Sequence, residues 1–309
     1  MQKDIFGLHH VTAISDNARN NHQFYTEVLG LRMVKKTVNF DDPGTYHFYF
    51  GDEYGTPGSI ITFFPWEGIG KGVNGAGMAT HTGYSVPAGS LEFWKKRLAK
   101  YGINSEESVK FGEEVLSFND PDGMQLQLIV PDKSDLREPW TTDEINEEFA
   151  IRGFHNVTLT LRSKEATSKV LTDIFGYSLV KQEGNTYRFE TDTIETANIL
   201  DIIENPNAPD GRNAAGTNHH IAFRVKNDDI LMEVRDRVVA SGLNITPKIN
   251  RDYFFSLYFR EPGGVLFEVA TDNPGFTVDE SLESLGSSLK LPARYESMRS
   301  KIEAILPEL

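Results

Sequence analysis

The chain has 309 residues, of which 39% are hydrophobic and 11% aromatic, and its formal net charge is −14 at pH 7. This composition suffices for two domains with hydrophobic cores and excludes a disordered chain. The negative charge argues against a nucleic-acid partner, which would need a clustered basic surface to displace counterions. No cysteine is present, so disulfides and thiolate metal ligands are excluded.

Targeting and membrane signals are absent from the sequence. Residues 1–4 lack the apolar run of a signal peptide, and no stretch approaches the roughly 20 apolar residues of a membrane span. We therefore expect a soluble protein of the reducing cytoplasm, without nucleic-acid or membrane partners. The sequence leaves open whether the protein is a homo-oligomer.

The first 65 residues predict a strand, a helix and a run of strands. Gly7–Ser15 is rich in β-forming residues. Asp16–Asn17 is a suitable N-cap for a helix that stops at Gly30. The aromatic and β-branched segments Tyr46–Phe50 and Ser59–Phe64 predict paired antiparallel strands. We interpret this order as one βαβββ unit.

A second unit of the same kind follows. It opens with a strand at Thr80–Val86, continues with a helix at Gly89–Tyr101, and closes with strands at Val115–Phe118 and Met124–Val130. The preceding glycine-rich segment Gly68–Gly77 is not followed by a helix that could offer its N-terminus to a phosphate. We expect that segment to be a mobile loop.

The same block of sequence then occurs again. Phe24–Val34 resembles Val170–Val180. Gly30 thereby matches Gly176, an offset of 176 − 30 = 146. The second unit matches the fourth at offsets of 140 and 141. Internal repetition of this kind identifies the architecture more reliably than local propensity. The third and fourth units are expected over residues 154–203 and 218–271.

The repeat predicts an α+β fold of four βαβββ units paired into two domains. We place the first domain at residues 1–131 and the second at 151–275. The polar, acidic segment 132–150 is expected to be a surface linker. Residues 276–309 form a C-terminal tail.

The tail is expected to be helical. Met298, Ile302 and Ile305 recur at helical spacing within Tyr295–Leu306. This pattern predicts a helix that docks on the body of the protein, and a role at the active site is the alternative.

Aligning the units shows which residues share a position. The four first strands give His10, His81, Asn156 and His220. The last strands of the second and fourth units give Gln127 and Glu268, since 127 + 141 = 268. Strand alternation directs Glu268 away from the core-facing Phe267 and Val269. We therefore expect one polar, concave face that carries histidines and a carboxylate.

A carboxylate on an internal strand is costly to bury unless it meets a cation or a metal. Two imidazoles and one carboxylate on one face leave half of an octahedral metal open, which is the arrangement used by non-haem Fe(II) oxygenases. An isolated histidine is more often structural, so the argument depends on Glu268. The pattern predicts a metal cofactor, Fe(II) first and Mn(II) or Zn(II) as alternatives, and no organic cofactor.

Five segments narrow the interpretation of the function: Leu8–Thr12, Tyr46–Phe50, Gly55–Gly58, His219–His220 and Pro262–Glu268. Together with the βαβββ pairs, they resemble the vicinal oxygen chelate superfamily (glyoxalases, bleomycin-resistance proteins and extradiol dioxygenases). Within it they are most similar to the dioxygenases that cleave the ring of hydroquinones. The resemblance covers nearly the whole chain, and its specificity lies in the combination of segments.

The resemblance implies a ligand set and a reaction. Its metal ligands match His10, His220 and Glu268, so the metal would join the first unit to the fourth. Extradiol catechol enzymes differ, because all their ligands come from the second domain, and Asn156 occupies their first histidine position here. The expected function is Fe(II)-dependent ring cleavage of a hydroquinone-like substrate with O2.

The resemblance also implies four catalytic residues around the substrate: His9, His219, Arg251 and Tyr258. In similar enzymes His9 or His219 would accept the phenolic proton, a role that suits an imidazole. Arg251 would hold an anionic oxygen, and Tyr258 would donate a hydrogen bond.

Simpler interpretations remain open for several of these residues. Strand parity alone turns His9 and His219 toward the core, and Arg251 could be a surface cation. We expect a structural role for His155, which matches His9 by register. His47 and Thr12 could be polar residues that line a strand and nothing more. For the whole chain, the alternatives are a glyoxalase-like isomerase or lyase and a non-catalytic small-molecule-binding protein.

Overall fold

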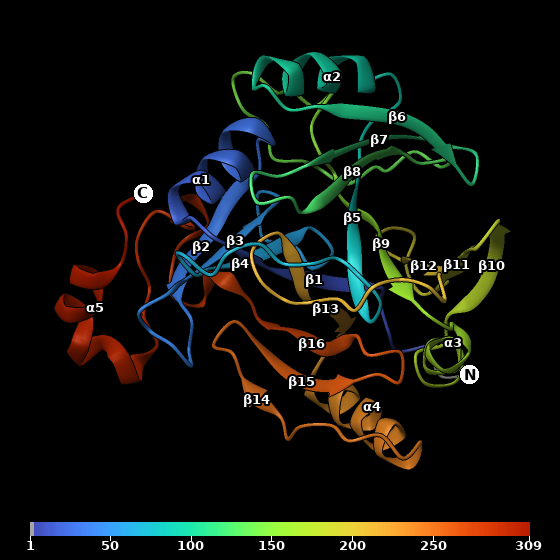
Figure 1. Cartoon of the computed structure of the whole chain (residues 1–309). Helices are drawn as coiled ribbons and strands as arrows, with labels where there is room; N and C mark the ends of the chain where they lie inside the picture. The colour runs from blue at the N-terminus through green and yellow to red at the C-terminus, as the bar shows by residue number, and fades with distance from the viewer. Residues whose placement is uncertain (1–2) are drawn as a thin grey trace.

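The computed structural model of the chain describes residues 3–309 and has an α+β fold with two curled eight-stranded sheets (Figure 1). Each of the four predicted units contains a strand, a helix and three further strands in that order. The predicted fold class and the four βαβββ units are therefore confirmed.

The first sheet joins the first unit to the fourth. Its strands are β1 (Leu8–Ser15), β2 (Arg32–Val38), β3 (Tyr46–Gly51), β4 (Ile60–Pro65), β13 (Thr217–Val225), β14 (Ile249–Asn250), β15 (Phe254–Arg260) and β16 (Leu266–Pro274). They lie in the order β14-β15-β16-β13-β1-β4-β3-β2. At the centre β1 and β13 are antiparallel, whereas β1 with β4 and β13 with β16 are parallel.

The second sheet joins the second unit to the third. Its strands are β5 (Met78–Ser85), β6 (Ser105–Lys110), β7 (Glu113–Asn119), β8 (Gln125–Val130), β9 (Gly153–Leu161), β10 (Ser178–Glu183), β11 (Thr186–Glu190) and β12 (Ile199–Glu204). Their order is β10-β11-β12-β9-β5-β8-β7-β6, with β5 and β9 antiparallel at the centre. The two sheets thus share one plan.

Each sheet contains strands from both of the domains that the sequence predicted. The segments 1–131 and 151–275 each contribute four strands to each sheet. The division therefore follows the repeat along the chain, and as a division into domains it stays a prediction.

The helix of the first unit changes type along its length. Asn17 caps α1 (Ala18–Gln23) by accepting a hydrogen bond from the backbone N–H of Asn20. The helix continues as the π-helix η1 (Phe24–Val28) and ends before Gly30, whose φ of 68° suits glycine. The third unit repeats this with α3 (Glu165–Lys169) and η2 (Val170–Ile174), whereas the other two units have α2 (Leu91–Lys100) and α4 (Asp228–Ala240).

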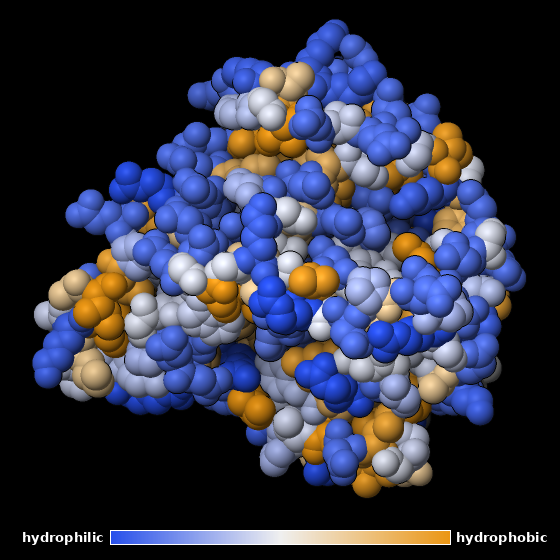
Figure 2. Space-filling model, in the orientation of Figure 1, coloured by the Kyte–Doolittle hydropathy of each residue, from blue (hydrophilic) through white to orange (hydrophobic). Residues whose placement is uncertain are grey.

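Strand alternation positions the polar face inside the first sheet. Phe267 and Val269 are fully buried in the core, and Glu268 between them is buried as well. The outer surface in view is mainly hydrophilic, with hydrophobic residues in small scattered groups (Figure 2). In the described part of the chain, no helix has both the length and the apolar composition needed to span a membrane.

Segment 132–150 is more than a surface linker. Most of its residues are exposed, but Ile145 and Ala150 are buried in the main hydrophobic cluster. Trp94 donates a hydrogen bond from Nε1 to the carbonyl oxygen of Phe149. The sequence did not predict these buried contacts, because a single buried isoleucine in a polar segment produces no hydrophobic periodicity.

The glycine-rich loop 68–77 pairs with the loop that precedes β13. Backbone bridges join Lys71 to Ala215 and Val73 to Arg212. The expected mobility of this loop stays a prediction, and the loop has defined partners in the other half of the chain.

The tail docks on the first sheet, as predicted, although its contacts differ from those expected. In α5 (Arg299–Ile305), Ile302 is buried, whereas Met298 and Ile305 are 43% and 65% exposed. Hydrophobic residues are visible near α5 in Figure 2. One apolar contact from the helix is supplemented by Tyr295, which donates a hydrogen bond to the carbonyl oxygen of Phe40.

A buried lysine makes the strongest polar contact between the tail and the sheet. Lys35 on β2 has no exposed surface, and its Nζ lies 2.6 Å from Asp279 Oδ1 and 2.5 Å from Glu280 Oε2. The same ammonium donates to the carbonyl oxygen of Phe276, 3.1 Å away. Its three hydrogens are thus all used by the tail.

Replacing this lysine should destabilise the protein. Lys35→Ala leaves the buried Glu280 carboxylate without its cation, so we expect the free energy of unfolding to fall by about 3 kcal/mol or more. Lys95→Ala, which breaks an exposed pair with Glu107, is the control and should lower the free energy of unfolding far less. Urea denaturation of both variants measures the difference, and equal losses would contradict the role of the buried pair.

Candidate metal centre

Three predicted ligands converge at the centre of the first sheet. His10 lies on β1, His220 on β13 and Glu268 on β16, which are adjacent strands. His10 Nε2 is 3.1 Å and His220 Nε2 is 2.8 Å from Glu268 Oε2. The three candidate ligand atoms all lie within 4.8 Å of one another, and all three residues are buried.

The two carboxylate oxygens of Glu268 have different surroundings. Glu268 Oε1 accepts a hydrogen bond from the Ser256 hydroxyl on β15. Glu268 Oε2 and His220 Nε2 are both buried and make no hydrogen bond, despite their short separation. The Glu268 carboxyl group therefore faces two imidazole nitrogens at short range.

This donor set fits a metal ion. Ligands about 2.0–2.2 Å from an ion and at right angles to one another are separated by about 2.8–3.1 Å, the range of the two contacts to Glu268. An ion would also supply a partner for the two orphaned buried atoms. Within residues 3–309, this is the one group of histidines and carboxylates with suitable spacing.

The first histidine doublet selects the tautomer of a ligand. His9 Nε2 lies 3.1 Å from the carbonyl oxygen of Thr271, which can only accept, so neutral His9 carries its hydrogen on Nε2. His9 Nδ1 then accepts the hydrogen of His10 Nδ1, 2.9 Å away. His10 Nε2 is thereby left with a lone pair for a metal.

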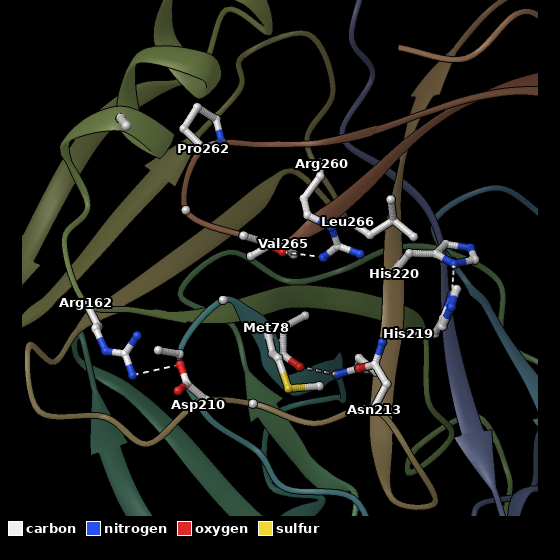
Figure 3. A pocket seen from close by; sticks show the side chains of 18 of the residues that line it. Met78, Arg162, Asp210, Asn213, His219, His220, Arg260, Pro262, Val265 and Leu266 are labelled. Carbon is white, nitrogen blue, oxygen red and sulfur yellow. Dashed lines mark hydrogen bonds and ion pairs between the residues drawn. The ribbon is translucent and has the colours of Figure 1, made fainter. Parts of the chain in front are cut away.

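The second doublet has the same geometry on β13 (Figure 3). His220 Nδ1 lies 2.8 Å from His219 Nδ1. If His220 Nε2 offers its lone pair to a metal, Nδ1 carries the hydrogen and donates it to His219. Burial, together with His220 and Arg260, lowers the pKa of His219 to about 3. Neutral His219 therefore keeps an N–H on its outer nitrogen.

The two outer histidines occupy different environments. His219 lines the cavity at the metal ligands, whereas His9 does not and is only 2% exposed. Both ring nitrogens of His9 are already used. For His9 the geometry favours the core-facing orientation that strand alternation predicts, rather than direct contact with a substrate.

A cavity of about 410 Å³ opens beside the three ligands. Its aromatic wall consists of Phe40, Phe64, Trp66 and Phe254. Its polar groups include Thr12, His47, His219, Arg251 and Tyr258. This combination suits a flat aromatic ligand that carries a few oxygens.

Arg251 and Tyr258 form a pair within this wall. Arg251 donates a hydrogen bond from Nε to Tyr258 Oη at 3.2 Å. Burial, aided by the Glu268 charge, raises the pKa of Tyr258 far above its usual value. Tyr258 is thus a neutral phenol that lines the cavity. Arg251 also meets Asp41 at 3.5 Å, so it is neither isolated nor a simple surface cation.

A second, polar cavity of about 540 Å³ also borders the second doublet (Figure 3). It includes His219 and His220 and is bordered by Arg260, which donates to the carbonyl oxygen of Gly264. At its far side Arg162 pairs with the exposed Asp210. The second cavity has no aromatic wall, so the first cavity is the better site for a ring.

The corresponding face of the second sheet is filled by ion pairs. Arg188 lies 2.9 Å from Asp201 and 2.6 Å from Glu113, which also meets His155 at 3.1 Å. Asn156 donates to Asp201 rather than facing a metal. The arrangement agrees with the structural role expected for His155.

Ser256 was missed by the sequence analysis. It precedes Tyr258 by two residues and so shares its strand face, but serine on a strand carries no distinctive chemical signal.

Comparison with known proteins identifies the family that the chain matches. Residues 7–128 and 153–269 match the Glyoxalase/Bleomycin resistance protein/Dioxygenase superfamily. The chain is 46% identical over 303 residues to the "Putative ring-cleaving dioxygenase MhqE" of Bacillus subtilis, covering 98% of this chain and 99% of that protein. It is 35% identical over 303 residues to the "Chlorohydroquinone/hydroquinone 1,2-dioxygenase" of Sphingobium indicum, covering 96% and 94%.

Solved structures agree on the architecture. The crystal structure of a "putative dioxygenase" from Bacillus subtilis has a TM-score of 0.96 and 42% identity, covering 100% of this chain and 98% of that one. Glyoxalase I from Zea mays has a TM-score of 0.63 at 15% identity, covering 86% and 92%, and thus shares the fold alone.

Removing a ligand should abolish metal retention. We expect His10→Ala, His220→Ala and Glu268→Gln to lose bound metal while circular dichroism shows a folded protein, because each removes one of three donors. His81→Ala and Gln127→Ala, at equivalent positions of the second sheet, are matched controls. Elemental analysis after anaerobic loading with Fe(II) is the measurement. Metal loss in the controls alone would move the site to the second sheet.

Proposed function

Because the chain belongs to the Glyoxalase/Bleomycin resistance protein/Dioxygenase superfamily, we propose that it is an Fe(II)-dependent dioxygenase that cleaves the ring of a hydroquinone-type substrate with O2. The observation that carries the proposal is the buried group of His10, His220 and Glu268 at the end of an aromatic cavity. The relatives named for ring cleavage and for hydroquinone support the choice of reaction and substrate.

Fe(II) is our proposal for the metal, with Mn(II) or Zn(II) as alternatives. A bound Fe(II) ion would supply the redox chemistry and Lewis acidity that dioxygen activation needs. Elemental analysis of anaerobically purified protein distinguishes the three metals.

The residues of the chain would orient the ring and donate hydrogen bonds to its oxygens. Phe64 and Phe254 would pack against the aromatic ring. Tyr258 would donate a hydrogen bond to a developing oxyanion, and Arg251 would stabilise that charge through its guanidinium.

The tautomers of the doublets revise the role expected for His219. With Nδ1 accepting from His220, neutral His219 presents an N–H and is a hydrogen-bond donor to substrate oxygen, not a proton acceptor. Its low pKa also makes it a weak base. His9 would act through His10 by holding its tautomer.

Oxygen uptake tests the reaction. We expect the metal-loaded protein to consume one O2 per hydroquinone and to turn over hydroquinone faster than catechol. An oxygen electrode with both substrates, and with the metal-free protein as control, is the measurement. Conversion of methylglyoxal with glutathione without oxygen uptake would support the isomerase alternative. Ligand binding without any turnover would support the non-catalytic one.

A second test separates His219 from the metal ligands. His219→Ala should keep the metal but lower kcat by about 10²-fold, the usual effect of losing one donor to an oxyanion. Bound iron and single-turnover ring cleavage are measured on the same sample, with His81→Ala as control. Unchanged turnover would assign His219 to packing, and loss of iron would make it a ligand.

A further inference from the structure

A continuous line of hydrogen bonds crosses three strands beside the metal ligands. Tyr49 Oη lies 2.9 Å from His47 Nδ1, and His47 Nε2 lies 2.9 Å from Thr62 Oγ1. Thr62 Oγ1 then donates to Thr12 Oγ1 at 2.9 Å. The line runs from β3 through β4 to β1, and it ends on the strand that carries His10.

The line has one direction. Thr62 has a single hydroxyl hydrogen and gives it to Thr12, so its oxygen must accept from His47 Nε2. Neutral His47 then has a bare Nδ1, which accepts from the Tyr49 hydroxyl. All three hydrogen bonds therefore point toward Thr12.

Burial keeps the groups of this line neutral. Tyr49, Thr62 and Thr12 are each at most 1% exposed. Burial raises the pKa of Tyr49 and lowers the pKa of His47, so both groups stay neutral. Among the residues that the structure describes, Thr12 Oγ1 accepts one hydrogen bond and donates none. Its own hydrogen is left for the cavity, which Thr12 lines.

The second sheet shows that the fold does not require this line. Strand register places Thr158 and Asp201 where the first sheet has Thr12 and Thr62. The position of Tyr49 is taken by Arg188, which forms an ion pair with Asp201. At these positions the second sheet thus has an ion pair, whereas the first sheet has a line of hydrogen bonds between neutral side chains.

Thr12 follows His10 by two residues on the same face of β1, which separates their Cα atoms by about 6.6 Å. This is the scale of a six-membered ring with an oxygen at each end. We propose that Tyr49, His47 and Thr62 are positioning residues that aim the Thr12 hydroxyl, as a donor, at the ring oxygen remote from the metal. The inference rests on the proposed function and adds a determinant of specificity for 1,4-diols.

Anaerobic binding tests this without turnover. In the metal-loaded protein, Thr12→Val should raise the dissociation constant for hydroquinone about 5- to 10-fold, as expected for one lost hydrogen bond. Binding of phenol, which has no second oxygen, should not change, and Thr12→Ser should bind hydroquinone as the parent protein does. Thr158→Val, the counterpart in the second sheet, is the control and should leave both constants unchanged.

A double-mutant cycle tests positioning. Tyr49 also lines the cavity, so the cycle separates a direct contact from an action through Thr12. Tyr49→Phe should weaken hydroquinone binding about 3-fold in the parent protein and add nothing in the Thr12→Val background. A merely structural role would lower thermal stability and affect phenol and hydroquinone alike in both backgrounds. That result, or hydroquinone binding that Thr12→Val leaves unchanged, overturns the inference. Binding with the expected pattern but without oxygen uptake would refute the proposed reaction and leave the inference standing.

Discussion

The candidate metal centre depends on the antiparallel pairing of β1 with β13. This pairing places Thr12 opposite His220 and His10 opposite Ala222, so the two imidazoles lie on one face within reach of each other. The parallel pairing of β13 with β16 then sets Glu268 beside Ala222. A slip of one residue in either ladder would turn a ligand into the core, because side chains alternate. The apolar partners of the ligands, such as Phe267 and Val269, hold the register.

Much of this could be predicted from the sequence, because the protein repeats itself. The offset of 146 located the helix of the third unit, which ends before Gly176. The aligned first strands gave four candidate positions, and the family resemblance selected His10 and His220 among them. Alternation around Glu268 correctly indicated a buried carboxylate between core residues. These predictions need only local periodicity and register, which a sequence carries.

Other features depend on contacts between distant strands and could not be predicted. Strand periodicity alone does not say that the first unit shares a sheet with the fourth, since either pairing of units would bury similar apolar strands. That pairing was implied only by the family resemblance. The sequence also does not show that His9 reaches the carbonyl oxygen of Thr271, a contact that fixes a tautomer. Thr62 and Ser256 are ordinary strand residues until their neighbours are known.

The pairing of the first strand with the thirteenth also has a consequence for biosynthesis. A ribosome releases the chain from the N-terminus, and His10 precedes Glu268 by 268 − 10 = 258 residues. The second sheet, by contrast, is complete in sequence once β12 has emerged. A nascent chain therefore cannot form the three-ligand pocket while its C-terminal unit is still within the ribosome. Until that unit emerges, the edge of β1 that pairs with β13 has no partner strand. The three candidate ligands can therefore meet only late in synthesis, once residue 268 has left the ribosome.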